Sequence, residues 1–194
     1  MTRPAPIPRT RKPAAVRREE ILQAAAVEFA ETGLAGTRLE AIAARAGISH
    51  PRIVQMFGSK RALFLEVVQV VFDRIAWTFG EVADRPATGI ESTSLVAMGD
   101  AYRRLLQRDR TTSLMMLQSY AAASDSTVRE AVARHYLALQ RKISDLTGAD
   151  ILQVRTFFAT GFIVTVSTAL GLPGKRTDTT WAGWLLKLTD SNGL

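Results

Sequence analysis

Residues 37–60, T-R-L-E-A-I-A-A-R-A-G-I-S-H-P-R-I-V-Q-M-F-G-S-K, decide the fold of this chain. The segment opens with the T-x-x-E pattern of a capping box, in which Thr37 and Glu40 satisfy the first free amides of a helix. Apolar residues then recur at helical spacing as far as Gly47, where a helix can end in the left-handed conformation. We therefore expect a short helix between Thr37 and Gly47, closed by a tight turn.

A second short helix follows the turn. Ser49 is placed to cap it, and Pro51 is tolerated in its first turn because those amides have no intrahelical partner. One side of this helix is apolar and consists of Ile53, Met56 and Phe57. The residues that point elsewhere are His50, Pro51, Arg52 and Gln55. The two helices together predict a helix-turn-helix whose second helix can enter a DNA major groove with its N-terminus first.

This geometry predicts which side chains meet DNA. The first residues of a recognition helix meet base edges, whereas caps and flanking cations meet phosphates. The base-reading candidates are His50, Pro51, Arg52 and Gln55, with Arg52 suited to guanine and Gln55 to adenine; each such bidentate contact is worth about 1–3 kcal/mol of discrimination. The phosphate candidates are Thr37, Arg38, Ser49 and Lys60. We expect Arg45 to be a solvated residue of the polar side of its helix.

The net charge of +7 is unevenly distributed along the chain. Residues 1–61 contain 11 Lys/Arg against 5 Asp/Glu, whereas residues 62–194 contain 14 against 13. A cluster of cations that displaces condensed counterions is what binding to nucleic acid requires. A solvated basic tail alone has the same composition, but its coincidence with a helix-turn-helix favours the nucleic-acid interpretation.

The rest of the chain predicts further helices and no strand. Residues 1–13 are rich in Pro and Arg and are expected to form a disordered basic arm, which either lies along DNA or makes no contact. A helix over 14–32 completes a DNA-binding domain at 14–61, and a helix over 60–84 is long enough to lead into a second domain at 62–194. The remaining predicted helices span 92–109, 112–123, 125–147, 149–171 and 179–189. The fold class is all-α, with about nine helices.

Composition excludes several classes of function. The chain has no cysteine and therefore no disulfide, thiolate metal site or cysteine nucleophile, which fits a reducing cytoplasm. Its two histidines lie in different predicted domains, and no spacing typical of a catalytic motif, metal site or cofactor site occurs. The uncharged run 156–172 has 17 residues, fewer than the roughly 20 that span a membrane, and predicts a core or interface helix. We expect no enzyme, no metal, no cofactor and no membrane insertion.

The runs G-T-R-L-E-A-I-A-A-R-A-G-I-S and H-P-R-I-V-Q-M-F-G-S-K-R-A-L-F resemble the DNA-binding domain of TetR-type transcriptional regulators. The matching features are Ile42-Ala43, Ala46-Gly47-Ile48-Ser49, Phe57-Gly58-Ser59-Lys60 and Leu63-Phe64. Lys60 matches the family lysine that is associated with contact to the DNA backbone. The chain departs from the family where an aromatic residue is common in the recognition helix, since it has Arg52 and Val54 there.

The resemblance implies a biological setting. It implies a bacterial cytoplasmic, nucleoid-associated regulator that binds a pseudo-palindromic double-stranded operator as a homodimer. The helices near 149–171 and 179–189 would form the twofold interface, with Trp181 and Trp184 as core or interface anchors. A repressor released by a small-molecule inducer is favoured over an activator.

The resemblance also implies that residues 90–170 enclose a pocket for a small apolar or aromatic inducer. Plausible lining residues there and on the preceding helix are Trp77, Phe79, Met98, Tyr102, Met115, Met116, Tyr120, His135, Phe158 and Phe162. The same residues could equally fill a plain core, because any helical bundle contains them. The adjacent thioethers of Met115 and Met116 are the best lead, since flexible side chains suit an adaptable cavity.

One other interpretation stays open, namely a helical dimer or adaptor that has the helix-turn-helix without sequence-specific DNA binding. It accounts for the missing aromatic residue in the recognition helix. It does not account for the charge segregation, or for Arg52 and Gln55 on the face that would read bases.

Overall fold

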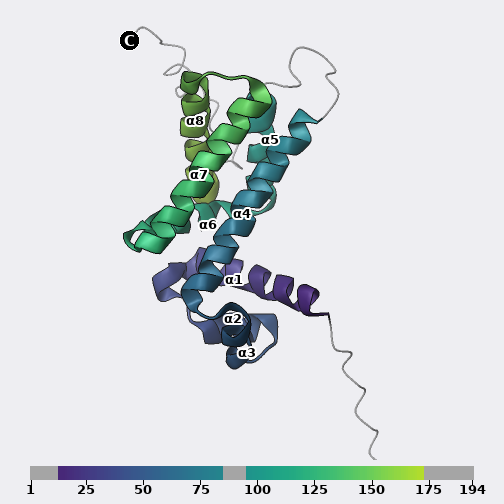
Figure 1. The fold of residues 1–194 in the computed structure, drawn as a ribbon, viewed down its shortest axis with the longest axis vertical. Helices are drawn as coiled ribbons and strands as arrows, with labels where there is room; N and C mark the ends of the chain where they lie inside the picture. The colour runs from purple at the N-terminus through teal and green to yellow at the C-terminus, as the bar shows by residue number, and fades with distance from the viewer. Residues whose placement is uncertain (1–12, 85–94, 173–194) are drawn as a thin grey trace, which may run out of the picture.

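The computed structural model describes residues 13–84 and 95–172. Within these ranges there are eight α-helices, one 3-10 turn and no strand, which confirms the all-α prediction. Helices α1 to α3 form a small unit at one end, and the body made by α5 to α8 lies at the other (Figure 1). The predicted arm at 1–13, apart from Pro13, and the helix at 179–189 lie outside the described residues, as do Trp181 and Trp184.

The small unit consists of α1 (Ala14–Gly36), α2 (Leu39–Ala46) and α3 (His50–Phe57) packed on the start of α4 (Lys60–Ala83). Its core is formed by apolar residues whose helical spacing the sequence displays, each between 0 and 6 % exposed. They are Ile21, Phe29, Ile42, Ile53, Phe57 and Phe64. The rings of Phe29 and Phe64 meet edge to face at 5.0 Å, which fastens α1 to α4.

The turn between α2 and α3 is built as predicted. Gly47 adopts the left-handed conformation at φ 64°, and the Ile48 amide donates to the Ala43 carbonyl at 3.0 Å. Ser49 occupies the N-cap position of α3 in an extended conformation, but its side chain makes none of the predicted capping hydrogen bonds, and Pro51 stands in the first turn. These local features fix the angle at which α3 leaves α2.

The predicted capping box at Thr37 and Glu40 is wrong. The N-cap of α2 is Arg38, and no side chain caps that helix. The Thr37 hydroxyl is instead 2.7 Å from the Gly33 carbonyl and 2.7 Å from the Thr32 hydroxyl, and Thr37 is only 2 % exposed. Packing of α2 against α1 buries this hydroxyl beside backbone carbonyls near the end of α1, which sequence spacing alone does not reveal.

The end of α1 also differs from the prediction of a stop at Gly33. Gly33 has φ 69° and ψ 177°, so the regular helix does break there, but a further helical turn continues to Gly36. Backbone angles of this kind are essentially restricted to glycine. The break lies where the chain turns from α1 toward α2.

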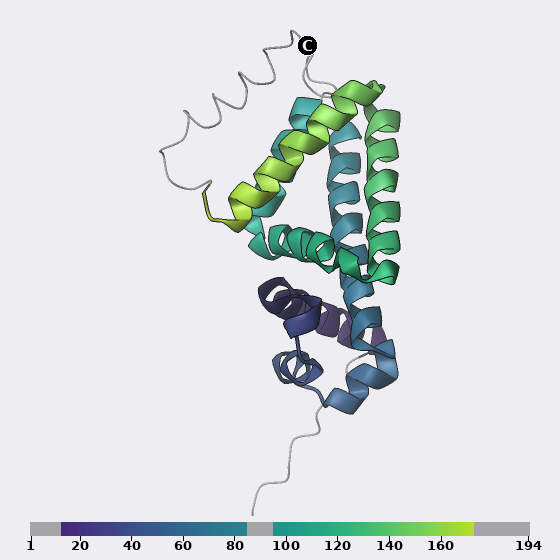
Figure 2. The same ribbon diagram turned by 90° about the vertical axis from the view of Figure 1, so that its left-hand side faces the viewer.

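The body contains α5 (Leu95–Arg108), α6 (Arg110–Ala121), α7 (Ser126–Thr147) and α8 (Ile151–Ala169). The 3-10 turn η1 (Ala122–Ser124) connects α6 to α7. Figure 2 shows α6 lying across the lower end of the body, next to the small unit, while α4, α7 and α8 run toward the opposite end. The long helix α4 therefore belongs to both parts of the molecule, as the sequence predicts.

Side-chain caps set the starts of the body helices. The Asp125 carboxylate accepts from the amides of Val128 and Thr127 at 3.2 and 2.9 Å, and the Val128 bond together with the Arg61 guanidinium lowers the pKa of Asp125. Asp150 and Gln153 form a complete capping box on α8. Asp109 caps α6 by accepting from Thr111, so α6 starts at Arg110, two residues before the predicted start at 112.

Helix α8 is the most apolar element described. Its 19 residues have a mean hydropathy of 1.3, which by length and composition alone suffices to cross a membrane, and 17 % of that stretch is buried. Exposed apolar side chains on or next to α8 are Ile151, Leu152, Phe162, Leu170 and Leu172. The opposite side of α8 packs against α5, α6 and α7.

Candidate nucleic-acid interface and ligand cavity

Helix α3 presents a polar surface to solvent. Ile53 and Phe57 point into the core at 1 % and 6 % exposure, whereas Pro51, Arg52 and Gln55 are exposed. Nη1 of Arg52 donates to Oε1 of Gln55 at 2.7 Å, so the two candidates for base contacts lie side by side. Three of the predicted base-reading residues thus share one accessible face.

His50, at the start of α3, has a partner in the preceding helix. Its Nδ1 atom lies 3.3 Å from Oε1 of Glu40, and both side chains are substantially exposed. A base contact by His50 requires this imidazole to leave Glu40 or to use its other ring nitrogen.

The four predicted phosphate contacts are placed very differently. Arg38 is exposed, and the Ser49 hydroxyl makes no capping bond, so both can reach a ligand. The buried Thr37 hydroxyl faces α1, and this geometry does not support a phosphate contact. The Lys60 ammonium donates to the carbonyls of Ala35 and Thr37 at 3.1 and 2.9 Å, which leaves one of its three hydrogens for a phosphate.

Two arginines of the small unit form ion pairs with residues of neighbouring helices. Arg45 Nε pairs with Glu28 Oε1 at 2.7 Å, and this hydrogen bond raises the pKa of Arg45. Arg45 is exposed, as the sequence predicts, and its ion pair with Glu28 also links α2 to α1. The Arg18 guanidinium stacks over the Phe57 ring at 4.5 Å and pairs with Glu66, so it braces α1 against α3 and α4.

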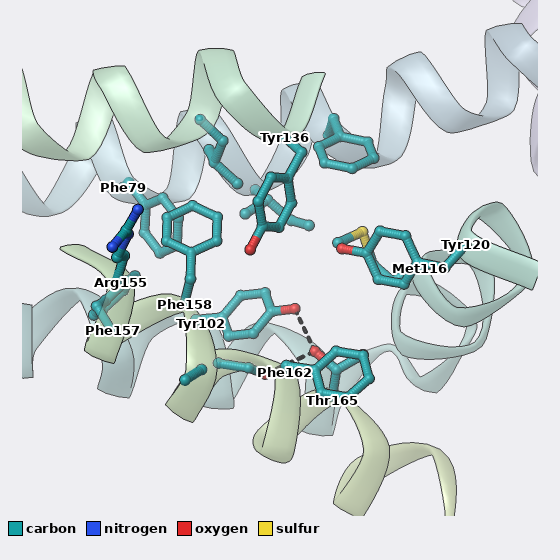
Figure 3. Close-up of a pocket in the computed structure, with 15 residues that line it drawn as sticks. Phe79, Tyr102, Met116, Tyr120, Tyr136, Arg155, Phe157, Phe158, Phe162 and Thr165 are labelled. Carbon is teal, nitrogen blue, oxygen red and sulfur yellow. Dashed lines mark hydrogen bonds between the residues drawn. The ribbon is translucent and has the colours of Figure 1, made fainter. Parts of the chain in front are cut away.

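A cavity of about 460 Å³ lies in the body. Its walls come from α4 to α8 and consist mainly of aromatic rings, many of which meet edge to face (Figure 3). The lining residues are Phe72, Ile75, Phe79, Tyr102, Met116, Tyr120, Tyr136, Leu139, Arg155, Phe157, Phe158, Ala159, Gly161, Phe162 and Thr165. Its size and apolar character are those of a small-molecule site.

The structure brings most, but not all, of the predicted lining residues to the cavity. Those that line it are Phe79, Tyr102, Met116, Tyr120, Phe158 and Phe162. Met98 and Met115 are core residues at 0 % and 1 % exposure, and Trp77 is 64 % exposed on the outer surface of α4. His135 lies outside the lining and stacks on Phe72 at 5.2 Å, and burial lowers its pKa. Adjacent residues on a helix point in different directions, and here Met116 lines the cavity while Met115 points into the core.

Sequence patterns did not indicate the other nine lining residues, which are Phe72, Ile75, Tyr136, Leu139, Arg155, Phe157, Ala159, Gly161 and Thr165. Phe158, Phe162 and Thr165 follow one another at helical spacing and therefore lie on one face of α8. This spacing could have added Thr165 to the predicted lining residues. Tyr136 and Arg155 carry no such signal, because only the packing of α7 and α8 brings them to the same cavity.

The polar groups of the cavity are few. The hydroxyls of Tyr102 and Thr165 are 2.7 Å apart, and burial raises the pKa of Tyr102 to about 12. Burial also raises the pKa of Tyr120 strongly, so both phenols are neutral near pH 7 and act as hydrogen-bond donors or acceptors. In Figure 3, Tyr120 and Arg155 lie at opposite ends of the cavity. Among the described residues no cluster of His, Asp or Glu could hold a metal ion.

Two helices connect the cavity to the helix-turn-helix unit. Helix α4 begins at Lys60, directly after α3, and its residues Phe72, Ile75 and Phe79 line the cavity. Helix α6 contributes Met116 and Tyr120 to the cavity, while its Gln118 reaches α1 and donates to the Ala30 carbonyl at 3.4 Å. The cavity is thus connected to α3 through α4 and to α1 through both α4 and α6.

The sequence of the N-terminal unit has known relatives. The model of the family described as "Bacterial regulatory proteins, tetR family" matches residues 21–67. The HTH-type transcriptional regulator RutR of Escherichia coli K12 is 40 % identical over 57 residues, which are 29 % of this chain and 27 % of RutR. This sequence match thus spans about a quarter of that relative.

Solved structures match nearly the whole chain. Salmonella enterica GusR has a TM-score of 0.67 at 20 % identity, covering 92 % of this chain and 98 % of that one. The Bacillus subtilis regulator FadR, in complex with stearoyl-CoA, has 0.66 at 20 % identity, covering 89 % and 97 %. A TetR-like regulator from Rhodococcus sp. RHA1 has 0.54 at 25 % identity, covering 85 % and 100 %. These likenesses show that the N-terminal unit and the body together form a fold that other solved structures also have.

Proposed function

We propose that this chain is a TetR-type regulator, namely a sequence-specific, DNA-binding transcriptional repressor that a small-molecule inducer releases; the family match of residues 21–67 and the fold support this proposal. The observation that carries the proposal is a polar recognition helix joined by one continuous helix, α4, to an aromatic cavity. Its place of action is the bacterial cytoplasm, at the nucleoid.

The DNA-binding part rests on α3. Arg52 and Gln55 offer donors in the arrangement that reads purines in the major groove, and Pro51 and His50 precede them at the helix N-terminus. Arg38, Ser49 and the remaining Lys60 hydrogen flank this face and supply phosphate contacts. The excess positive charge of residues 1–61 adds sequence-independent affinity.

The active form we propose is a homodimer through α8 and the segment near 179–189. Exposed apolar residues on α8, such as Leu152 and Phe162, lose their contact with water in such an interface. Thr156, Ala159 and Thr160 are small and exposed, so a second helix can approach α8 closely there. A twofold dimer presents two α3 helices to a pseudo-palindromic operator.

Induction works through the spacing of the two α3 helices. An inducer in the cavity pushes apart α4 and α6, and because α4 begins two residues after α3 and packs against it, the recognition helices move out of register with the half-sites. The stearoyl-CoA named for the Bacillus subtilis relative supports a ligand site in bodies of this fold. The inducer must bind the released conformation more tightly than the DNA-bound one.

Selection of bound duplexes from a random library at two salt concentrations tests the proposal. A palindromic consensus that persists at the higher salt supports a dimeric, sequence-specific reader. Recovery of no consensus, with binding that disappears at higher salt, contradicts it and leaves a basic helical adaptor with general affinity for polyanions. Release of the selected duplex by a compound that binds the cavity then tests induction.

A further inference from the structure

We propose that the inducer is an aromatic carboxylic acid whose rings lie among the aromatic walls of the cavity and whose carboxylate pairs with Arg155. This inference rests on the proposed function, since it names the ligand class of the same cavity. It starts from the charge of the lining, where Arg155 is the single charged residue and no Asp, Glu, Lys or His occurs.

Arg155 is available for an anion. It is exposed, and among the described residues no ion pair or hydrogen bond engages its guanidinium. Figure 3 places it at one end of the cavity, beside Phe79 and Phe158, with its nitrogens away from Tyr120. A guanidinium in this position can fork onto a carboxylate while the rest of the ligand stays in the apolar interior.

The interior favours aromatic rings over other apolar bodies. Phe157 contacts Phe79 and Phe158 at centroid distances of 5.7 and 6.1 Å, and Phe158 meets Tyr136 at 5.0 Å. A flat ring entering between such walls continues their edge-to-face arrangement. A cavity of about 460 Å³ has room for two fused rings with polar substituents.

The lining also disfavours other ligand classes. A cation would meet Arg155 and no carboxylate, so it would lose its hydration without a counter-charge. A second anionic group placed deep in the cavity would meet no cation there, only the hydroxyls of Tyr102, Tyr120, Tyr136 and Thr165. A single carboxylate at the Arg155 end, with a hydrogen-bonding group such as a phenol or ketone toward Tyr120, fits the polar groups that are present.

Calorimetric titration of the full-length protein tests this assignment with three naphthalene probes and one aliphatic acid. The probes are 2-naphthoic acid, 2-naphthamide, a 2-naphthyl trimethylammonium salt and decanoic acid. We expect naphthoate to bind roughly tenfold more tightly than the amide, because one charged hydrogen bond is gained. The ammonium salt should bind most weakly, and decanoate should bind more weakly than naphthoate.

Variants then test whether Arg155 causes the preference for the carboxylate. Arg155→Gln should lower the affinity for naphthoate to that for naphthamide, whereas Arg155→Lys should keep the preference for the acid. The control is Arg141→Gln, at an exposed arginine of α7 outside the cavity, which should leave both affinities unchanged. An acid preference that survives Arg155→Gln, or equal binding of acid, amide and cation, overturns the ligand class. Decanoate binding more tightly than naphthoate overturns its aromatic character.

The outcomes separate this inference from the proposed function. If the protein selects its duplex but shows no Arg155-dependent acid binding, the ligand class is wrong and the DNA-binding proposal stands. If naphthoate binds as expected but the protein selects no duplex, the cavity assignment stands and the regulatory proposal is wrong.

Discussion

Nη1 of Arg52 and Oε1 of Gln55 are joined by a 2.7 Å hydrogen bond on the exposed side of α3. The bond is the one expected between residues three apart on a helix, and it holds a guanidinium and an amide next to each other in the free protein. The two residues therefore form one polar unit at the place where a recognition helix meets base edges.

We expect Arg52→Ala to relax sequence preference at one or two operator positions, at a cost of about 1–3 kcal/mol against the preferred base. Gln55→Ala should relax a neighbouring position. Fluorescence anisotropy with single-base variants of the selected duplex measures both effects, and Arg104→Ala, at an exposed arginine of α5, serves as the control. Unchanged preference in both variants would place base reading elsewhere.

Lys60 bonds to the protein and is proposed to bind a phosphate, and the two roles can be tested separately. Loss of its bonds to the Ala35 and Thr37 carbonyls in Lys60→Met should lower the free energy of unfolding by about 1 kcal/mol. If its third hydrogen meets a phosphate, the slope of log affinity against log salt should also fall by about 0.9, equally for all duplexes. Denaturant unfolding and a salt series measure the two quantities. A stability loss with an unchanged salt slope would assign Lys60 a purely structural role.

Gly33 is the position where substitution strains the backbone. Gly33 has φ 69° and ψ 177°, which alanine adopts only with strain. Gly33→Ala should therefore lower the free energy of unfolding by about 1–3 kcal/mol, measured as a lower melting temperature. An added Cβ would also lie 2.7 Å from Gln118 Oε1, but that flexible side chain can move, so Gln118→Ala should not restore stability. Gly80→Ala is the control, because its Cβ meets only Lys142 Nζ at 3.6 Å and should be tolerated.

Alkaline pH should destabilise the body through Tyr102. Burial raises its pKa to about 12 from about 10 in the unfolded chain, so the unfolded state loses its proton first. The stabilising contribution is complete below pH 10 and decreases as the pH rises to 12. Tyr102→Phe should therefore lose less stability than the wild type between pH 10 and 12, as measured by circular dichroism during denaturant unfolding. Equal losses in both proteins would contradict the burial argument.

The dimer predicted through α8 can be broken at Thr160. This residue is exposed at the middle of the helix, and its hydroxyl bonds only to the Thr156 carbonyl of its own helix. Thr160→Arg should place a charge in the interface, convert the dimer to monomers in sedimentation analysis and weaken operator binding at least tenfold. Gln107→Arg, on the exposed side of α5, should remain dimeric. A Thr160→Arg protein that stays dimeric would move the interface away from this part of α8.

The sequence by itself determined the succession of helices and the helix-turn-helix. Gly47, Ser59 and the apolar periods of α1 to α4 act over a few residues, so local patterns are enough to place those elements. The predicted bounds of α4 and α7 agree with the structure within one residue for the same reason.

Only the tertiary structure decided which partner each polar group takes and which side chains share a cavity. Thr37 and Lys60 bond to carbonyls at the end of α1, and those carbonyls come within reach only when α1, α2 and α4 pack together. Arg155 and Tyr120 are 35 positions apart and meet one cavity because the packing of α6 and α8 brings both helices to its walls. The spacing of residues along the chain determines which side chains lie on one face of a helix, whereas the packing of the five helices around the cavity determines what those side chains contact.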